Sequence, residues 1–212
     1  MSILSVKHIC ISVQNRTIIQ NLSFQLEDRQ RLFLLGEIGT GKTTLLHSLL
    51  GFVPIERGEI KWFGQVCVTE KDFQPLRGKV GLCFQNADDQ LFGPSVLDDV
   101  AFGPLNQGLS KYQAYSIAEQ QLATLDIIRL KDRSITALSG GEKTFVALAG
   151  VLAMQPKALL LDEPTTGLDS RNKDKLSMLL AELELPMIIA SHDQVFIDNI
   201  SDSVIYMQPQ LL

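Results

Sequence analysis

The sequence of 212 residues has few cysteines, no long apolar run and no excess of basic residues. Its three cysteines, Cys10, Cys67 and Cys83, are odd in number and form no C-x-x-C pair, which predicts reduced, packed thiols rather than a disulfide framework. The formal net charge of −5 argues against a nucleic-acid partner. No apolar stretch is long enough to cross a bilayer, and we expect no secretion signal because the N-terminus lacks its basic and apolar regions.

The chain has enough apolar residues to form one domain with a sizeable core, because hydrophobic residues make up 45% of it. No repeat, low-complexity segment or linker divides it. Strand-like alternation near the N-terminus is followed by an Arg57-Gly58 turn and a strand at 59–63. From 95 to 145 the pattern is helical, and Ser110 with Gln113 predicts a capping box. After residue 158, strands and helices alternate, which predicts a largely parallel sheet covered by helices.

The segment GEIGTGKT at 36–43 matches the phosphate-binding pattern G-x-x-x-x-G-K-[ST]. An apolar strand at 32–35 precedes it and a helical segment at 44–50 follows it. The loop is therefore expected at a helix N-terminus, where glycines allow tight folding and free N–H groups bind an anion. Lys42 would reach the β and γ phosphates, and the Thr43 hydroxyl would face Mg²⁺. The plain alternative is a glycine-rich turn without a ligand.

The segment LLLDEP at 159–164 is predicted to be a second buried strand that ends in two acids. A carboxylate at the carboxyl end of such a strand lies beside the phosphate loop. Asp162 would bind Mg²⁺ directly or through water, and Glu163 would orient or deprotonate the attacking water. The alternative is a strand that ends in two solvated acids without a function. The presence of the phosphate loop favours the functional interpretation.

The segment LSGGE at 138–142 precedes a helical stretch at 143–154. Ser139 and the two glycines predict a second anion-binding helix end. The chain thus has one phosphate loop but two helix ends that could bind an anion. A head-to-tail dimer would explain both, if each LSGGE closes over the nucleotide of the partner. The alternative is an ordinary N-cap followed by flexible glycines.

Together these residues resemble the ATP-binding cassette (ABC) ATPases over nearly the whole chain. The resemblance implies that Gln85 senses the γ-phosphate side, that His192 contacts the γ-phosphate and that Asp169 lies at the dimer interface. It also implies an α/β fold of the P-loop NTPase type, with a mostly parallel sheet, an N-terminal antiparallel β-subdomain and an inserted helical lobe. The nucleotide-binding core would comprise 1–84 and 146–212, and the lobe approximately 85–145.

The resemblance and the motifs together give a set of expected site residues. The catalytic residues would be Glu163, His192, Gln85 and Lys42. The groups that hold Mg²⁺ would be Thr43, Gln85 and Asp162. The residues that contact ATP would be Gly36, Glu37, Ile38, Gly39, Thr40, Gly41, Lys42, Thr43, Thr44, Ser139, Gly140, Gly141, Glu142 and Val13.

The segment at 85–104, QNADDQLFGPSVLDDVAFGP, resembles the ATPases of energy-coupling factor transporters, which import vitamins or cobalt and nickel ions. In those proteins the equivalent of residues 88–92 forms a short helix that holds the integral membrane subunit. The resemblance therefore implies a membrane-subunit dock near Gln85 to Phe102. The alternative is that Leu91, Phe92 and their apolar neighbours only pack the helical lobe.

The chain also departs from the ABC pattern at several positions. Val13 stands nearest to the position where the family places an aromatic residue that stacks on adenine. Arg29 replaces a glycine, and Glu142 replaces the glutamine of the signature. Phe145 and Gly150 stand where the family has arginines.

The sequence thus predicts an ATP-hydrolysing subunit of a membrane importer at the cytoplasmic face of the membrane. It would work as a homodimer or a heterodimer with a related ATPase, and would join the membrane through its partner subunits. Two other functions stay open. A DNA-maintenance ABC ATPase would carry long coiled coils or basic surfaces, whereas a nucleotide-binding regulator would turn over little ATP.

Overall fold

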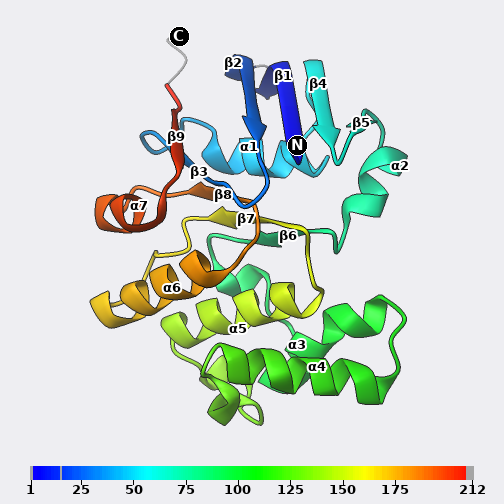
Figure 1. The fold of residues 1–212 in the computed structure, drawn as a ribbon, viewed down its shortest axis with the longest axis vertical. Coiled ribbons are helices and arrows are strands. Elements are labelled where there is room, and N and C mark those ends of the chain that lie inside the picture. Colours follow the sequence, from blue (N-terminus) through cyan, green and yellow to red (C-terminus); the bar gives the residue numbers. More distant parts are fainter. Residues whose placement is uncertain (1, 15, 209–212) are drawn as a thin grey trace.

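The computed structural model describes residues 2–14 and 16–208, and these form two sheets, a helix between them and a helical region on the far side (Figure 1). The antiparallel sheet has the order β2-β1-β4-β5 and the parallel sheet the order β6-β7-β8-β3-β9. The strands are β1 (Leu4–Val13), β2 (Arg16–Leu26), β3 (Arg31–Leu35), β4 (Arg57–Trp62), β5 (Gln65–Cys67), β6 (Val80–Cys83), β7 (Ala158–Asp162), β8 (Met187–Ala190) and β9 (Ser203–Tyr206).

Seven α-helices connect these strands within the described residues. They are α1 (Lys42–Leu49), α2 (Glu70–Phe73), α3 (Val96–Asn106), α4 (Lys111–Thr124), α5 (Gly140–Ala153), α6 (Ser170–Glu182) and α7 (Gln194–Ile200). Short 3₁₀ helices occur at Gln74–Leu76, Ala87–Asp89, Ile128–Leu130 and Ile135–Ala137. The predicted fold class is confirmed: a mostly parallel sheet is combined with an antiparallel β-subdomain and a helical lobe.

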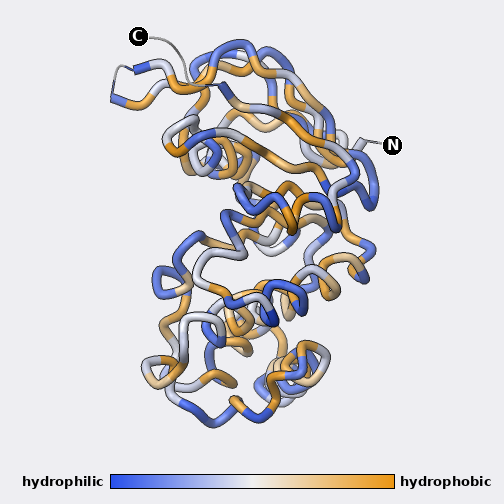
Figure 2. Tube along the Cα trace, turned by 90° about the vertical axis from the view of Figure 1, so that its left-hand side faces the viewer, coloured by the Kyte–Doolittle hydropathy of each residue, from blue (hydrophilic) through white to orange (hydrophobic). Residues whose placement is uncertain are grey.

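The inner strands β7 and β8 are buried on both faces of the parallel sheet. Alternate residues of a strand point to opposite faces, so each strand contributes to both core clusters. In β3, Phe33 belongs to the core cluster on the side of α5 and α7, where its ring meets that of Phe196 edge-to-face. Leu32 and Leu34 belong to the cluster that contains residues of α1 and the antiparallel sheet. In Figure 2 apolar segments occur along the whole length of the elongated trace, and many of the outer loops are hydrophilic. Helix α1 is therefore held between two sheets, and Leu45 and Leu46 on it have no exposed surface.

The helical lobe consists mainly of α3 and α4, which lie beyond α5 on the side away from the antiparallel sheet (Figure 1). The predicted capping box is present, since Ser110 and Gln113 bond reciprocally at the start of α4. The division of the chain at 145/146 stays a prediction. Helix α5 runs continuously across it, packing against α3 and α4 on one side and β6 on the other.

One local expectation is wrong: Arg57 and Gly58 are not a turn before the strand but the first residues of β4. Gly58 has φ 100°, and a Cβ there would lie 2.6 Å from the Cα of Ile9 in β1. The glycine is needed because the two strands approach closely at a bulge, where their register shifts between Lys7 and Cys10.

The three cysteines are free and buried, as the sequence predicts. Within the described residues, no helix is both long enough and apolar enough to cross a membrane.

Candidate functional site

The candidate site lies where four parallel strands end. The phosphate loop follows β3, Gln85 follows β6, Glu163 follows β7 and His192 follows β8. Because all of these strands run parallel, their carboxyl ends meet at one edge of the sheet. Residues that are up to 156 positions apart in the sequence are thus brought together by the sheet topology alone.

The phosphate loop turns sharply into α1, and Gly41 is the residue that makes the turn possible. Gly41 is the N-cap of α1 and has the left-handed backbone conformation, with φ 92°. A Cβ at this position would lie 2.4 Å from Cγ2 of Ile18. Both the conformation and the close contact exclude a larger residue, so the sequence pattern has a steric reason here.

Lys42 points back into the loop rather than into solvent, and only 8% of it is exposed. Its Nζ donates hydrogen bonds to the carbonyl oxygens of Gly36, at 2.7 Å, and Glu37, at 3.2 Å. These bonds hold the ammonium group over the opening of the loop, where it can compensate phosphate charge. The buried Thr40 hydroxyl also donates to the Glu37 carbonyl, at 2.9 Å, and so ties the loop together.

A cleft beside the loop gathers half of the expected site residues. It is lined by Ile18, Ile38, Gly39, Gly41, Lys42, Thr43, Thr44, Gln85, Asp162 and Glu163. Ile18 was not among the residues expected at the site, since its only sequence signal is its place in an N-terminal strand. Val13 does not line this cleft; it ends β1 and is 40% exposed. The role of Val13 in base stacking therefore stays a prediction.

Asp162, at the end of β7, carries the chemistry expected of a Mg²⁺ site. It is only 3% exposed, and its Oδ1 is buried with no hydrogen-bond partner in the described structure. Burial raises the pKa of this carboxyl group, while the neighbouring Thr43 hydroxyl works against the rise. A buried oxygen without a partner is costly, and a hard cation would satisfy it.

The residues present therefore fit a Mg²⁺ ion that is shared with a nucleotide. No group of three or more His, Cys, Asp or Glu side chains that could hold an ion occurs in residues 2–14 and 16–208. One carboxylate with a hydroxyl and phosphate oxygens is the usual protein environment of Mg²⁺ in such sites. Thr43, Asp162 and the exposed Gln85 are the side chains placed to contribute, directly or through water.

Glu163 is held in a strained position between two partners. Its backbone is left-handed, with φ 47°, which is costly for a residue with a side chain. Its Oε2 lies 2.7 Å from Nδ1 of His192, and its Oε1 lies 3.9 Å from Nζ of Lys42. The backbone N–H of Glu163 donates to the carbonyl of Ala190 in β8. Strand pairing and side-chain bonds thus aim one carboxylate at the cleft.

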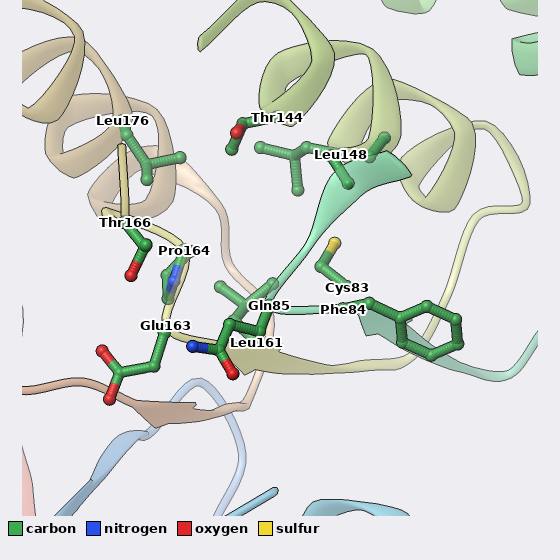
Figure 3. A pocket seen from close by; sticks show the side chains of 12 residues that line it. Cys83, Phe84, Gln85, Thr144, Leu148, Leu161, Glu163, Pro164, Thr166 and Leu176 are labelled. Atoms are coloured by element: carbon green, nitrogen blue, oxygen red, sulfur yellow. The ribbon is translucent and has the colours of Figure 1, made fainter. Parts of the chain in front are cut away.

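Figure 3 shows Gln85 and Glu163 on the ends of the neighbouring strands β6 and β7. Behind them lies a small, mostly apolar hollow between these strand ends and α5. It is lined by Cys83, Phe84, Gln85, Ala87, Thr144, Ala147, Leu148, Leu161, Glu163, Pro164, Thr166 and Leu176. Burial raises the pKa of Cys83 to about 12, so this thiol stays neutral and serves as an apolar wall.

The signature segment forms the predicted helix start but does not line the cleft of its own chain. Ser139 is the N-cap of α5, and its Oγ accepts a hydrogen bond from the N–H of Glu142. Gly140 and Gly141 follow in the first turn, and a Cβ at Gly140 would meet open space. None of residues 139–142 borders the cleft beside the phosphate loop. Asp169, expected at the dimer interface, caps α6 by accepting from the N–H of Asn172.

The segment expected to hold a membrane subunit divides into a buried and an exposed part. Leu91 is only 8% exposed and belongs to the core, so its assignment to the docking surface is wrong. Phe92 and Phe102 are 65% and 44% exposed, and their rings meet edge-to-face with centroids 4.6 Å apart. They border a groove of about 380 Å³ that also reaches Gly150.

The model of the ABC transporter family matches residues 19–166 of the chain. An uncharacterized ABC transporter ATP-binding protein of Haemophilus influenzae is 64% identical over 96% of this chain and 94% of its own length. The cobalt import ATP-binding protein CbiO of Rhodobacter capsulatus is 41% identical over 88% of this chain and 68% of its own.

Among solved structures, CbiO1 of Clostridium perfringens, described as part of the ABC transporter complex CbiONQ, is similar with a TM-score of 0.88. It is 32% identical, and the alignment covers 99% of this chain and 87% of that one. The family model covers the phosphate loop, the signature and the acidic strand end. The chain therefore belongs to the ABC transporter family and is an ATP-binding, ATP-hydrolysing subunit of a transporter.

Proposed function

We propose that the chain powers a membrane importer of the energy-coupling factor type, for metal ions or vitamins. The observation that carries this proposal is the exposed pair Phe92 and Phe102 at its own groove, in the segment that resembles those ATPases. An aromatic pair at a groove is a suitable anchor for an apolar segment of another protein. The similarity to two CbiO proteins supports the same transporter class.

In the proposed mechanism, Lys42 and the N–H groups of the phosphate loop bind the triphosphate of ATP. Glu163 accepts the proton of a water molecule that attacks the γ-phosphorus in line with the departing ADP oxygen. His192 keeps the Glu163 carboxylate turned towards that water through the 2.7 Å contact. Bound Mg²⁺ would neutralise charge on the β and γ phosphates, held by Thr43, Asp162 and Gln85.

The second copy enters the proposal through the signature. Ser139 and the N-terminus of α5 offer N–H groups to an anion, yet they do not border their own nucleotide cleft. In a head-to-tail dimer, each signature would close over the ATP of the other copy. Closure would move the attached membrane subunits and hydrolysis would reopen the pair. Both copies would lie at the cytoplasmic face of the membrane.

Three measurements test this function. Purified protein should release phosphate from ATP in the presence of Mg²⁺, and a chain that binds ATP without turnover would favour a regulatory role. Detergent extraction of native membranes through a tag on this chain should recover one integral membrane partner, identified by mass spectrometry. Reconstituted with that partner in liposomes, the complex should take up Co²⁺, Ni²⁺ or a vitamin only with ATP. Uptake of none of these would contradict the importer assignment.

A further inference from the structure

Glu142 places an acid in the signature, where the resemblance leads one to expect a neutral glutamine. Its carboxylate is turned back onto the start of α5: Oε2 accepts from the N–H of Ser139, at 2.9 Å, and from the Ser139 hydroxyl, at 3.0 Å. These bonds lower the pKa of Glu142, and two nearby arginines lower it further, so the group is ionised at neutral pH. A fixed negative charge therefore lies in the first turn of α5.

This charge conflicts with the role proposed for the signature. A carboxylate in the first turn competes with a phosphate for the same positive helix end, and two like charges near each other repel. An acidic signature therefore needs compensation before it can approach a γ-phosphate of the partner's ATP.

Two arginines from the segment before the signature supply a compensating charge. Nη1 of Arg133 lies 3.2 Å from Oε1 and 3.4 Å from Oε2 of Glu142. Arg129 is more distant, with Nη1 3.7 Å from Oε1, and its side chain is 72% exposed. The Arg133 guanidinium also donates to the carbonyl of Ala137, which fixes it beside the helix start.

We propose that Arg133, assisted by Arg129, is a positioning residue that neutralises Glu142 and holds its carboxylate on Ser139, so that α5 can accept the partner's ATP. The inference rests on the proposed role of the signature in a head-to-tail dimer. Arg133 acts through Glu142 and needs no contact with the nucleotide itself. Because Arg133 is half exposed, its effect should weaken as salt screens the charges.

The experiment is a double-mutant cycle on ATP-dependent dimerisation, measured by sedimentation velocity in a Glu163→Gln background. Arg133→Gln should weaken the ATP-loaded dimer about fivefold, which is the upper range for a partly exposed ion pair. The same Arg133→Gln change made on top of Glu142→Gln should have less than about twofold effect, because no charge is left to neutralise. Arg129→Gln should lie between the parent and Arg133→Gln.

The cycle separates this role from a merely structural one. If Arg133 only supports the turn through the Ala137 carbonyl, Arg133→Gln will weaken the dimer equally in both backgrounds, and the inference is overturned. An unchanged dimer in Arg133→Gln overturns it as well. Melting temperatures of all variants identify any general loss of folding, and a fivefold effect that persists undiminished at high salt also speaks against charge neutralisation.

A further variant distinguishes failure of the inference from failure of the proposed function. Ser139→Arg places a bulky side chain at the start of α5 and should block dimerisation if the signature closes over the partner's ATP. If dimerisation survives Ser139→Arg, the role of the signature itself is wrong. If Ser139→Arg blocks the dimer and Arg133→Gln leaves it intact, only the role of Arg133 is wrong.

Discussion

The Oε2 atom of Glu163 lies 2.7 Å from Nδ1 of His192, although the two residues follow different strands and are 29 positions apart. The His192 backbone N–H faces the same oxygen, at 3.3 Å. Glu163 is almost buried, whereas the His192 side chain is 72% exposed. The carboxylate is thus held from its outer side by a solvent-exposed imidazole.

Because Glu163 is fixed in this way, its substitution by glutamine should affect chemistry far more than binding. Glu163→Gln should keep ATP affinity but lower turnover about 100-fold or more, since an amide cannot accept the proton of the attacking water. It should also trap an ATP-loaded dimer that size-exclusion chromatography resolves. Phosphate release at the parent rate would contradict the assignment of Glu163.

Lys42→Ala should instead act on binding. The ammonium group that the Gly36 and Glu37 carbonyls hold over the loop would be lost, and with it a charge facing the phosphates. We expect a loss of ATP affinity of at least about tenfold, equivalent to about 1.4 kcal/mol, in a calorimetric titration. Lys71→Ala, on the exposed surface of α2, is the matched control and should bind ATP as the parent does.

The burial of Leu91 beside the exposed Phe92 sharpens the test of the docking surface. Replacing both Phe92 and Phe102 by serine should abolish co-purification of the membrane partner while keeping the melting temperature and ATP binding. Leu91→Ser should lower the melting temperature, because it places a hydroxyl in the core. Tyr112→Ser, at an 85% exposed position on α4, is the control. Retention of the partner by the double serine variant would place the dock elsewhere.

Asp162→Asn should separate stability from activity. The buried Asp162 carboxylate has an oxygen without a partner and a raised pKa, so the folded state holds its proton more tightly than the unfolded state. Ionisation of Asp162 therefore lowers the free energy of unfolding as pH rises from the ordinary aspartate pKa through the raised pKa of the folded state. In EDTA at pH 7, Asp162→Asn should raise the free energy of unfolding, measured by urea denaturation, by roughly 1 kcal/mol. In acid, where the parent carboxyl group is protonated, this difference should vanish.

Activity should move in the opposite direction. Asp162→Asn removes the carboxylate expected to hold Mg²⁺, so Mg²⁺-dependent hydrolysis should fall strongly. An asparagine variant that is no more stable than the parent at pH 7 would mean that the carboxylate is satisfied by groups not evident in the structure.

Local signals in the sequence predicted the strand–loop–helix unit at Gly41 and Lys42 and the acids at the end of β7, because each depends on neighbouring residues. The capping box of Ser110 and Gln113 was predictable for the same reason. The sequence could not give the contact of Ile18 with Gly41, which depends on how β2 passes the loop.

The sequence also could not predict that Leu91 is buried while Phe92 is exposed. These residues stand in an irregular segment after the 3₁₀ helix Ala87–Asp89, where no periodicity tells an inner from an outer side chain. The pairing of Arg133 with Glu142 depends on the path of the chain between Leu130 and α5. The positions of charged residues in the sequence do not predict that path. Tertiary contacts, not motif residues, are what the structure adds.

The last prediction concerns adenine, for which the cleft offers no aromatic ring among its lining residues. The triphosphate should therefore supply most of the binding free energy, and we expect weak discrimination between ATP and GTP. Val13→Tyr would add a ring at the end of β1, and base stacking is worth about 1–3 kcal/mol per base in single-strand binding proteins. We expect the low end, about 1 kcal/mol or about fivefold tighter ATP binding.

Ile18→Tyr is the informative comparison, because Ile18 borders the cleft and packs against Gly41. A ring there would collide with the phosphate loop, so this variant should lose rather than gain affinity. Titrating ATP and GTP against the parent and both variants completes the test. A strong preference for ATP in the parent, with no gain from Val13→Tyr, would mean that another residue recognises the base and that Val13 is not the equivalent of the family's aromatic residue.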